Sequence, residues 1–151
     1  MKKTLIVIGV IIALVIAYWL ISPLFINKRV SEEFPMQDTQ AASEKILAGS
    51  FVGFDKIHYG SGDVSVIKTD EGYIIRFEDN FDVANGPDLY VGFGKDGEYV
   101  KGSEIGRLKG NIGSQNYELP AGVNLADYNE VWIWCRAFST GFARAVLTPS
   151  I

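Results

Sequence analysis

The residues with the most distinctive chemistry are a single cysteine, Cys135, and a single histidine, His58. A cysteine thiolate can act as a nucleophile, a metal ligand or a redox group. One cysteine excludes an intramolecular disulfide, and one Cys with one His is too small a set for a zinc site, so we predict no metal centre. Three interpretations of Cys135 stay open: inert packing beside Val131, Ile133 and Ala137, redox chemistry, and ligation of a prosthetic group.

His58 stands at the end of an expected strand, next to the turn-forming segment 59–62. It could pair with Cys135 in space, or it could form a hydrogen bond to the turn. A Cys–His nucleophile also needs a third group that orients the histidine, and the sequence identifies none. His58 is therefore a candidate for ligand binding rather than an assigned catalytic base.

Segment 79–88 concentrates oxygen-bearing side chains, among them Asn85 and Asp88. Such a loop invites a calcium interpretation, but its spacing does not match an EF-hand loop. Asx turns before Gly86-Pro87 explain the same residues more simply. We therefore do not expect calcium, and we keep Asn85 and Asp88 as ligand-binding candidates.

The segment 130–137 is the most apolar strand candidate. Alternation places Trp132, Trp134 and Arg136 on the face opposite Cys135. This aromatic face could be the edge of a core closed by a cation–π contact, or the floor of a binding cleft. Trp132 and Trp134 are accordingly the remaining ligand-binding candidates.

The elements that must position these residues are short strands separated by Gly, Asp and Asn clusters. We predict an all-β fold, an antiparallel β-sandwich or flattened barrel, over residues 49–151. Asp-Gly and related turns at 68–72 and 95–97 predict hairpins. The expected strands are Ser50–His58, Asp63–Thr69, Tyr73–Glu78, Leu89–Gly94, Glu98–Lys101, Gln115–Leu119, Glu130–Ala137 and Ala143–Thr148.

Residues 5–26 contain no charge, and a helix of that length spans about 33 Å, which is enough to cross a membrane. Flanking lysines and the aromatic pair Tyr18-Trp19 favour one transmembrane helix with a cytoplasmic stub at 1–4 and the remainder outside. The alternative is a signal peptide cleaved after Val15-Ile16-Ala17. Residues 27–48 are expected to form a polar linker, with a short helix over Thr39–Ala48.

The net charge of the chain is -4. From Leu47 onward 9 Lys and Arg face 14 Asp and Glu, with no basic stripe. A protein that tracks nucleic-acid phosphates needs the opposite balance. We therefore expect no nucleic acid among the partners.

In the order and spacing of its motifs the body resembles the DM-thirteen domain, also called the electron-transfer DM-thirteen domain. The resemblance runs from Gly49 to about Leu147. It rests on Gly49-Ser-Phe51, His58 with Ser61-Gly62-Asp-Val64, Phe77-Glu-Asp-Asn-Phe81, Asn85-Gly86-Pro87-Asp88-Leu89, Gly106-Arg-Leu108-Lys109-Gly110-Asn-Ile-Gly113-Ser-Gln115-Asn-Tyr117, Val131-Trp-Ile-Trp134-Cys135, Phe138, and Phe142-Ala-Arg-Ala145-Val-Leu147.

The resemblance implies a domain outside the cytoplasm, attached to the cell membrane by a single span, in which Cys135 acts in redox chemistry or electron transfer. The thiol would act bare or as ligand to a group such as haem. A protein redox partner or a surface ligand is implied, and whether the chain is an enzyme stays open. The alternative function is a non-catalytic binding or adhesion module in which Cys135 is only packed core.

Overall fold

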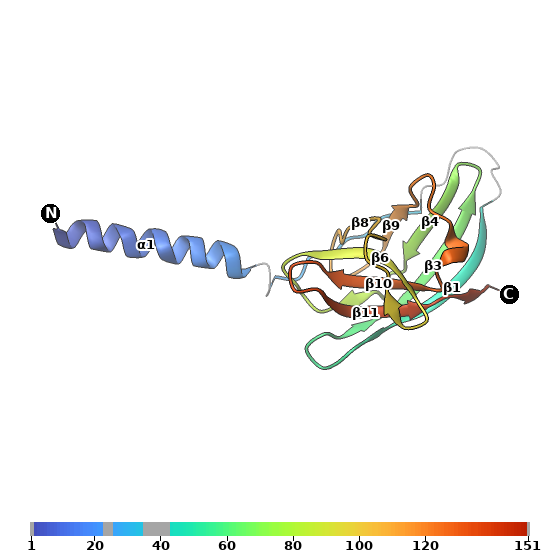
Figure 1. Ribbon diagram of the computed structural model, residues 1–151. Coiled ribbons are helices and arrows are strands. Elements are labelled where there is room, and N and C mark those ends of the chain that lie inside the picture. The colour runs from blue at the N-terminus through green and yellow to red at the C-terminus, as the bar shows by residue number, and fades with distance from the viewer. Residues whose placement is uncertain (1, 23–25, 35–42, 151) are drawn as a thin grey trace.

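The computed structural model describes residues 2–22, 26–34 and 43–150, with one helix ahead of a β domain (Figure 1). Helix α1 covers Lys2–Ile21, and a short 3₁₀ helix, η2, covers Leu125–Asp127. The strands are β1 (Glu44–Gly53), β2 (Gly60–Ser61), β3 (Asp63–Thr69), β4 (Gly72–Phe77), β5 (Asp82–Val83), β6 (Leu89–Lys95), β7 (Glu98–Tyr99), β8 (Gly106–Arg107), β9 (Gln115–Glu118), β10 (Glu130–Cys135), β11 (Thr140–Val146) and β12 (Thr148–Pro149).

The strands of the larger sheet run in the order β7-β6-β10-β11-β1-β3-β4-β9, with β8 paired to β6 and β12 to β1. All the strand pairs are antiparallel, and the sheet curls into a half barrel (Figure 1). The predicted antiparallel all-β fold is thereby confirmed. The expected turn between β6 and β7 is also present, with Asp96 and Gly97 at positive φ of 54° and 90°.

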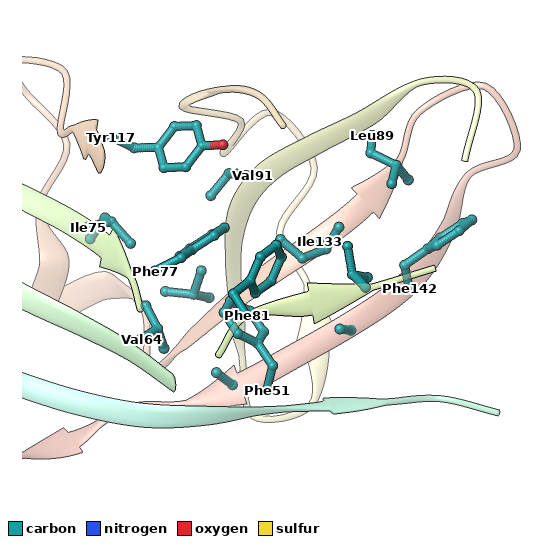
Figure 2. Close-up of a cluster of buried hydrophobic side chains, with 14 of the residues drawn as sticks. Phe51, Val64, Ile75, Phe77, Phe81, Leu89, Val91, Tyr117, Ile133 and Phe142 are labelled. Atoms are coloured by element: carbon teal, nitrogen blue, oxygen red, sulfur yellow. The ribbon is translucent and has the colours of Figure 1, made fainter. Parts of the chain in front are cut away.

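Aromatic side chains fill the inside of the curled sheet (Figure 2). The ring of Phe81, from the loop between β4 and β5, lies 5.1 Å from that of Phe51 on β1 and 4.6 Å from that of Phe77 on β4. Phe77 and Phe81 are fully buried. This cluster holds the two halves of the sheet together, and Cys135 belongs to it.

Strand β1 begins at Glu44, six residues before the expected start, and ends at Gly53 rather than at His58. Its early residues pair with β3, in a register that runs from Glu44 opposite Lys68 to Ser50 opposite Asp63. The helix predicted over Thr39–Ala48 is therefore wrong from Glu44 onward, because a sheet partner outweighs local helix preference. Residues 39–42 lie outside the described residues.

The first part of the predicted linker packs along the domain. The amide of Val30 donates to the carbonyl of Ile112 at 2.9 Å, and the amide of Ile112 donates to the carbonyl of Lys28 at 3.3 Å. A Cβ on Gly110 or Gly113 would collide with the backbone of this segment, so both glycines permit its close approach. Residues 28–34 thus fix the domain close to the end of α1, and residues 35–42 lie outside the described part.

Helix α1 is long and apolar enough to cross a membrane, and none of its stretch Lys2–Trp19 is buried by the domain. It ends at Ile21, inside the predicted span 5–26. Residues 23–25 of that span lie outside the described residues. An uncovered apolar helix of this length needs an apolar environment, which a membrane or a secretion signal would explain.

Candidate functional site

Cys135 is the last residue of β10, and its side chain is 0% exposed. In the sheet it lies between Leu89 of β6 and Thr140 of β11. Alternation along β10 directs it inward with Val131 and Ile133. A reagent or partner can therefore reach this sulfur only after the domain opens locally around it.

His58 is held in the loop between β1 and β2. Its Nδ1 lies 2.9 Å from Oδ2 of Asp55, whose other carboxylate oxygen accepts the amides of Ile57 and His58. The hydrogen bond from His58, followed by the two amides, lowers the pKa of Asp55 to about 2. The other side of the imidazole meets the ring of Phe142 edge-on at 4.7 Å. Asp55 and Phe142 thus hold His58 within the loop between β1 and β2.

A groove of about 700 Å³ opens at the end of the domain that α1 reaches. Leu89 on β6 is one of its lining residues and is the register partner of Cys135, so the buried thiol lies on the strand next to the one that lines the groove. Figure 2 shows Leu89 and Phe142 at the same end of the core. The lining residues are Ser22, Ile26, Asn27, Lys28, Asn85, Gly86, Pro87, Leu89, Arg107, Leu108, Lys109, Gly110 and Asn111.

Asparagines tie the walls of this groove together. Asn27 Oδ1 accepts from Asn85 Nδ2 at 2.7 Å and from Asn111 Nδ2 at 3.1 Å. Asn111 Oδ1 in turn accepts the amide of Lys28. Asn85, a predicted candidate, therefore bonds to the segment entering from α1 and orients the groove wall.

The wall at 108–111 is braced by Gln115, which is fully buried. Its Oε1 accepts the amides of Lys109 and Gly110 and the hydroxyl of Tyr117, the last at 2.7 Å. Burial raises the pKa of Tyr117 well above its usual range, so the hydroxyl keeps the proton that it donates. A fully bonded buried network of this kind keeps the loop rigid.

Asp88 links two arginines at the edge of the groove. Its carboxylate lies 2.9 Å from Arg107 and 3.2 Å from Arg136, and both guanidinium groups lie over the ring of Tyr90. The backbone carbonyl of Asp88 also accepts the amide of Arg136. Arg136 thus forms the cation–π contact with Tyr90 rather than with the tryptophans, and it ties the turn after Cys135 to the groove.

Trp132 and Trp134 lie on the other face of β10, as alternation predicts. Trp132 is buried, and its Nε1 donates to Oε2 of Glu130 at 2.7 Å. Trp134 stacks on Tyr99 with ring centroids 4.2 Å apart. Arg144 lies 3.0 Å from the other Glu130 oxygen. Glu130 and Tyr99 engage the two indoles, and Arg144 engages Glu130, which favours packing over a cleft floor.

Sequence reasoning missed the polar residues that shape the groove, namely Asn27, Lys28, Lys109, Asn111 and Gln115. The hydrogen bonds of Asn27 and Asn111 join residues that are 58 to 84 positions apart in the sequence, so no local pattern predicts them. The one available signal was the pair of glycines at Gly110 and Gly113, which admit the backbone of 28–30.

Comparison with known families supports the resemblance. The family model for Electron transfer DM13 matches residues 51–147, about two thirds of the chain. No curated protein and no solved structure matches it. The matched range contains Cys135, His58, both loops of the groove and the two tryptophans.

Proposed function

The chain belongs to the electron transfer DM13 family, and on that basis we propose that it is a membrane-anchored domain outside the cytoplasm that transfers electrons or acts in redox chemistry through Cys135. The observation that carries the proposal is the family match over residues 51–147. The groove at 85–87 and 107–111 is the proposed docking place for a protein partner, because Leu89, one of its lining residues, lies beside Cys135.

The membrane anchor in this proposal rests on α1. Lys2 and Lys3 precede its apolar stretch, and Tyr18 and Trp19 are exposed near its end, where interfacial aromatic residues stand. In an oxidising exterior a lone thiol remains free only if it is protected. The complete burial of Cys135 supplies that protection.

A lone thiol limits the redox step that Cys135 can perform. Its thiolate can attack one sulfur of a partner's disulfide, forming a mixed disulfide while the partner's other sulfur leaves as a thiolate. The chain has no second cysteine to resolve this bond, so a thiolate of a second partner molecule must attack the other sulfur, which releases Cys135 as a thiolate and moves the disulfide onto that molecule. The required opening is small, because Cys135 ends its strand beside the turn 136–139.

A haem-like group bound to Cys135 is less well supported by the packing. The sulfur is enclosed by core side chains, and Cys135 is not among the residues that line the groove. A flat group of porphyrin size does not fit beside this side chain without separating the strands. The visible absorption spectrum of the purified protein tests the prosthetic-group prediction directly.

The thiol mechanism is tested by exchange with a small disulfide reagent, using the full chain in detergent. We expect reaction at Cys135 under native conditions, abolished by Cys135→Ser. Arg136→Ala should accelerate it a few-fold, because it removes contacts to Asp88 and Tyr90 that hold the turn. Arg107→Ala is the matched control, because it removes the other partner of Asp88 without touching the turn. Reaction seen only after global unfolding would sink the mechanism.

The complete burial of Cys135 also supports the second candidate, a non-catalytic binding module. In that case Cys135→Ala would leave binding to a membrane partner intact, whereas changes in the groove wall, such as Pro87→Ala with Arg107→Ala, would weaken it. Cross-linking of the full chain in native membranes compares the two variants. Loss of the cross-linked partner with Cys135→Ala alone would exclude this candidate.

A further inference from the structure

Two loops of the β domain carry its most exposed large apolar side chains. Ile57, between β1 and β2, is 78% exposed, and Phe138, between β10 and β11, is 69% exposed. Single exposed apolar residues are ordinary, but both of these stand at the tips of loops. Neither contributes to the core, so their retention has another explanation.

Both loops lie at the same end of the sheet. Gly53, the last residue of β1, pairs with Ala143, and from there β11 runs back toward the turn that contains Phe138. Phe54 continues this course, because a Cβ on Gly141 would meet its ring. The two apolar residues therefore stand at the same end of the sheet, in loops that adjoin the ends of neighbouring strands.

The end of α1 reaches this same end of the domain (Figure 1). Ser22, directly after the helix, lines the groove together with Asn85 and Pro87. Lys28 is already bonded to the domain through Asn111, and six residues of extended chain reach at most about 20 Å. If Tyr18 and Trp19 lie at the outer membrane interface, this end of the domain lies at the headgroups.

We propose that the domain rests on the outer surface of its own membrane, with Ile57 and Phe138 inserted at the boundary of headgroups and acyl chains. Lys56 precedes Ile57, and its ammonium group can reach lipid phosphates beside that apolar tip. This inference rests on the proposed anchoring by α1, which supplies the high local concentration that makes so small a contact effective.

The opposite end of the sheet provides the contrast. The turn between β3 and β4 carries the exposed acidic residues Asp70 and Glu71. Docking through the apolar end therefore directs an acidic end toward solvent. It also places the groove and the turn beside Cys135 near the membrane surface, where a partner that is itself membrane-bound would reach them.

The test uses the full chain in vesicles of phosphatidylcholine and phosphatidylglycerol. The experiment uses a Cys135→Ser background, so that the native thiol is not labelled. A polarity-sensitive fluorophore is attached at Phe138→Cys or, as the matched control, at Glu71→Cys, with a nitroxide quencher on the lipid chains near the headgroups. We expect at least twofold stronger quenching, and a blue-shifted emission, at position 138. Equal quenching at the two positions would overturn the docking proposal.

Alkaline washing and flotation of the same vesicles separate this proposal from the anchor on which it rests. A chain that washes off refutes the anchor and the docking together, whereas a chain that stays with equal quenching refutes the docking alone. A second variant, Ile57→Ser in the Phe138-labelled chain, should lower the quenching. Val146→Ser, which removes an exposed apolar side chain near the other end, should leave it unchanged.

Discussion

The two faces of strand β10 hold their side chains in different ways. The inner face presents Val131, Ile133 and Cys135 to an apolar core and leaves none of them exposed to solvent. The outer face carries Trp132 and Trp134, which are held by hydrogen bonds and stacking to polar and aromatic neighbours. The cysteine therefore lies on the face with the least polar surroundings.

The comparison also clarifies the role of Arg136, the nearest cation in the sequence. A thiolate is stabilised by a neighbouring cation, but the guanidinium of Arg136 is bonded to Asp88 and lies 4.3 Å from the ring centroid of Tyr90. It contributes to the groove and the turn rather than to the thiol.

The largest effect should come from the inner face. Ile133→Ala removes a fully buried side chain in the middle of β10 and should lower the free energy of unfolding by about 2–5 kcal/mol, the transfer and cavity cost of such a change. Chemical unfolding of the full chain in detergent, followed by circular dichroism, measures it. Ile133→Val is the control and should cost about 0.5–1.5 kcal/mol. If Trp134→Ala lowers the free energy of unfolding more than Ile133→Ala does, the outer face of β10 contributes more to stability than the inner face, contrary to this prediction.

Much of the fold could be predicted because its signals are local. The alternation over Glu130–Cys135 and the Asp96-Gly97 turn each lie within a few residues. The start of β1 could not be predicted, because Glu44–Gly49 become a strand only by pairing with β3. Secondary structure that depends on a distant partner leaves little trace in its own sequence.

The candidate site was predicted less completely. The lone cysteine and the Asn85–Asp88 loop stand out by composition, and the structure places both at one end of the barrel. Gln115 and Asn111 do not stand out, because their function is to satisfy backbone groups of loops that only the fold brings near. Glu32 is a similar case: burial opposes its ionisation, but hydrogen bonds from Lys109 and Asn116 lower its pKa.

A smaller effect should come from the polar support of the outer face. Glu130 is buried and accepts from the indole of Trp132, from Arg144 and from the amide of Gly97. Glu130→Gln replaces one accepting oxygen by a donor and should destabilise the fold by about 1–3 kcal/mol. Denaturant midpoints compare it with Arg144→Met and the double variant. If the double variant loses as much unfolding free energy as the two single variants combined, Glu130 and Arg144 are not energetically coupled.

The smallest effect should come from Tyr99, which stacks on Trp134 while its hydroxyl is buried without a hydrogen-bond partner among the described residues. Burial, and then the nearby carboxylate of Glu104, raise the pKa of Tyr99 well above its usual range, so the hydroxyl stays neutral at ordinary pH. Tyr99→Phe keeps the stacked ring and removes an unsatisfied polar atom. It should change the free energy of unfolding by less than about 0.5 kcal/mol, and we expect that change to be a stabilisation.

Tyr99→Leu removes the stacking as well and should lower the free energy of unfolding by about 0.5–1.5 kcal/mol. A loss of unfolding free energy above about 1 kcal/mol for Tyr99→Phe would mean that the hydroxyl forms a stabilising hydrogen bond. The outer face would then be supported by polar bonds at Tyr99 as well as at Glu130.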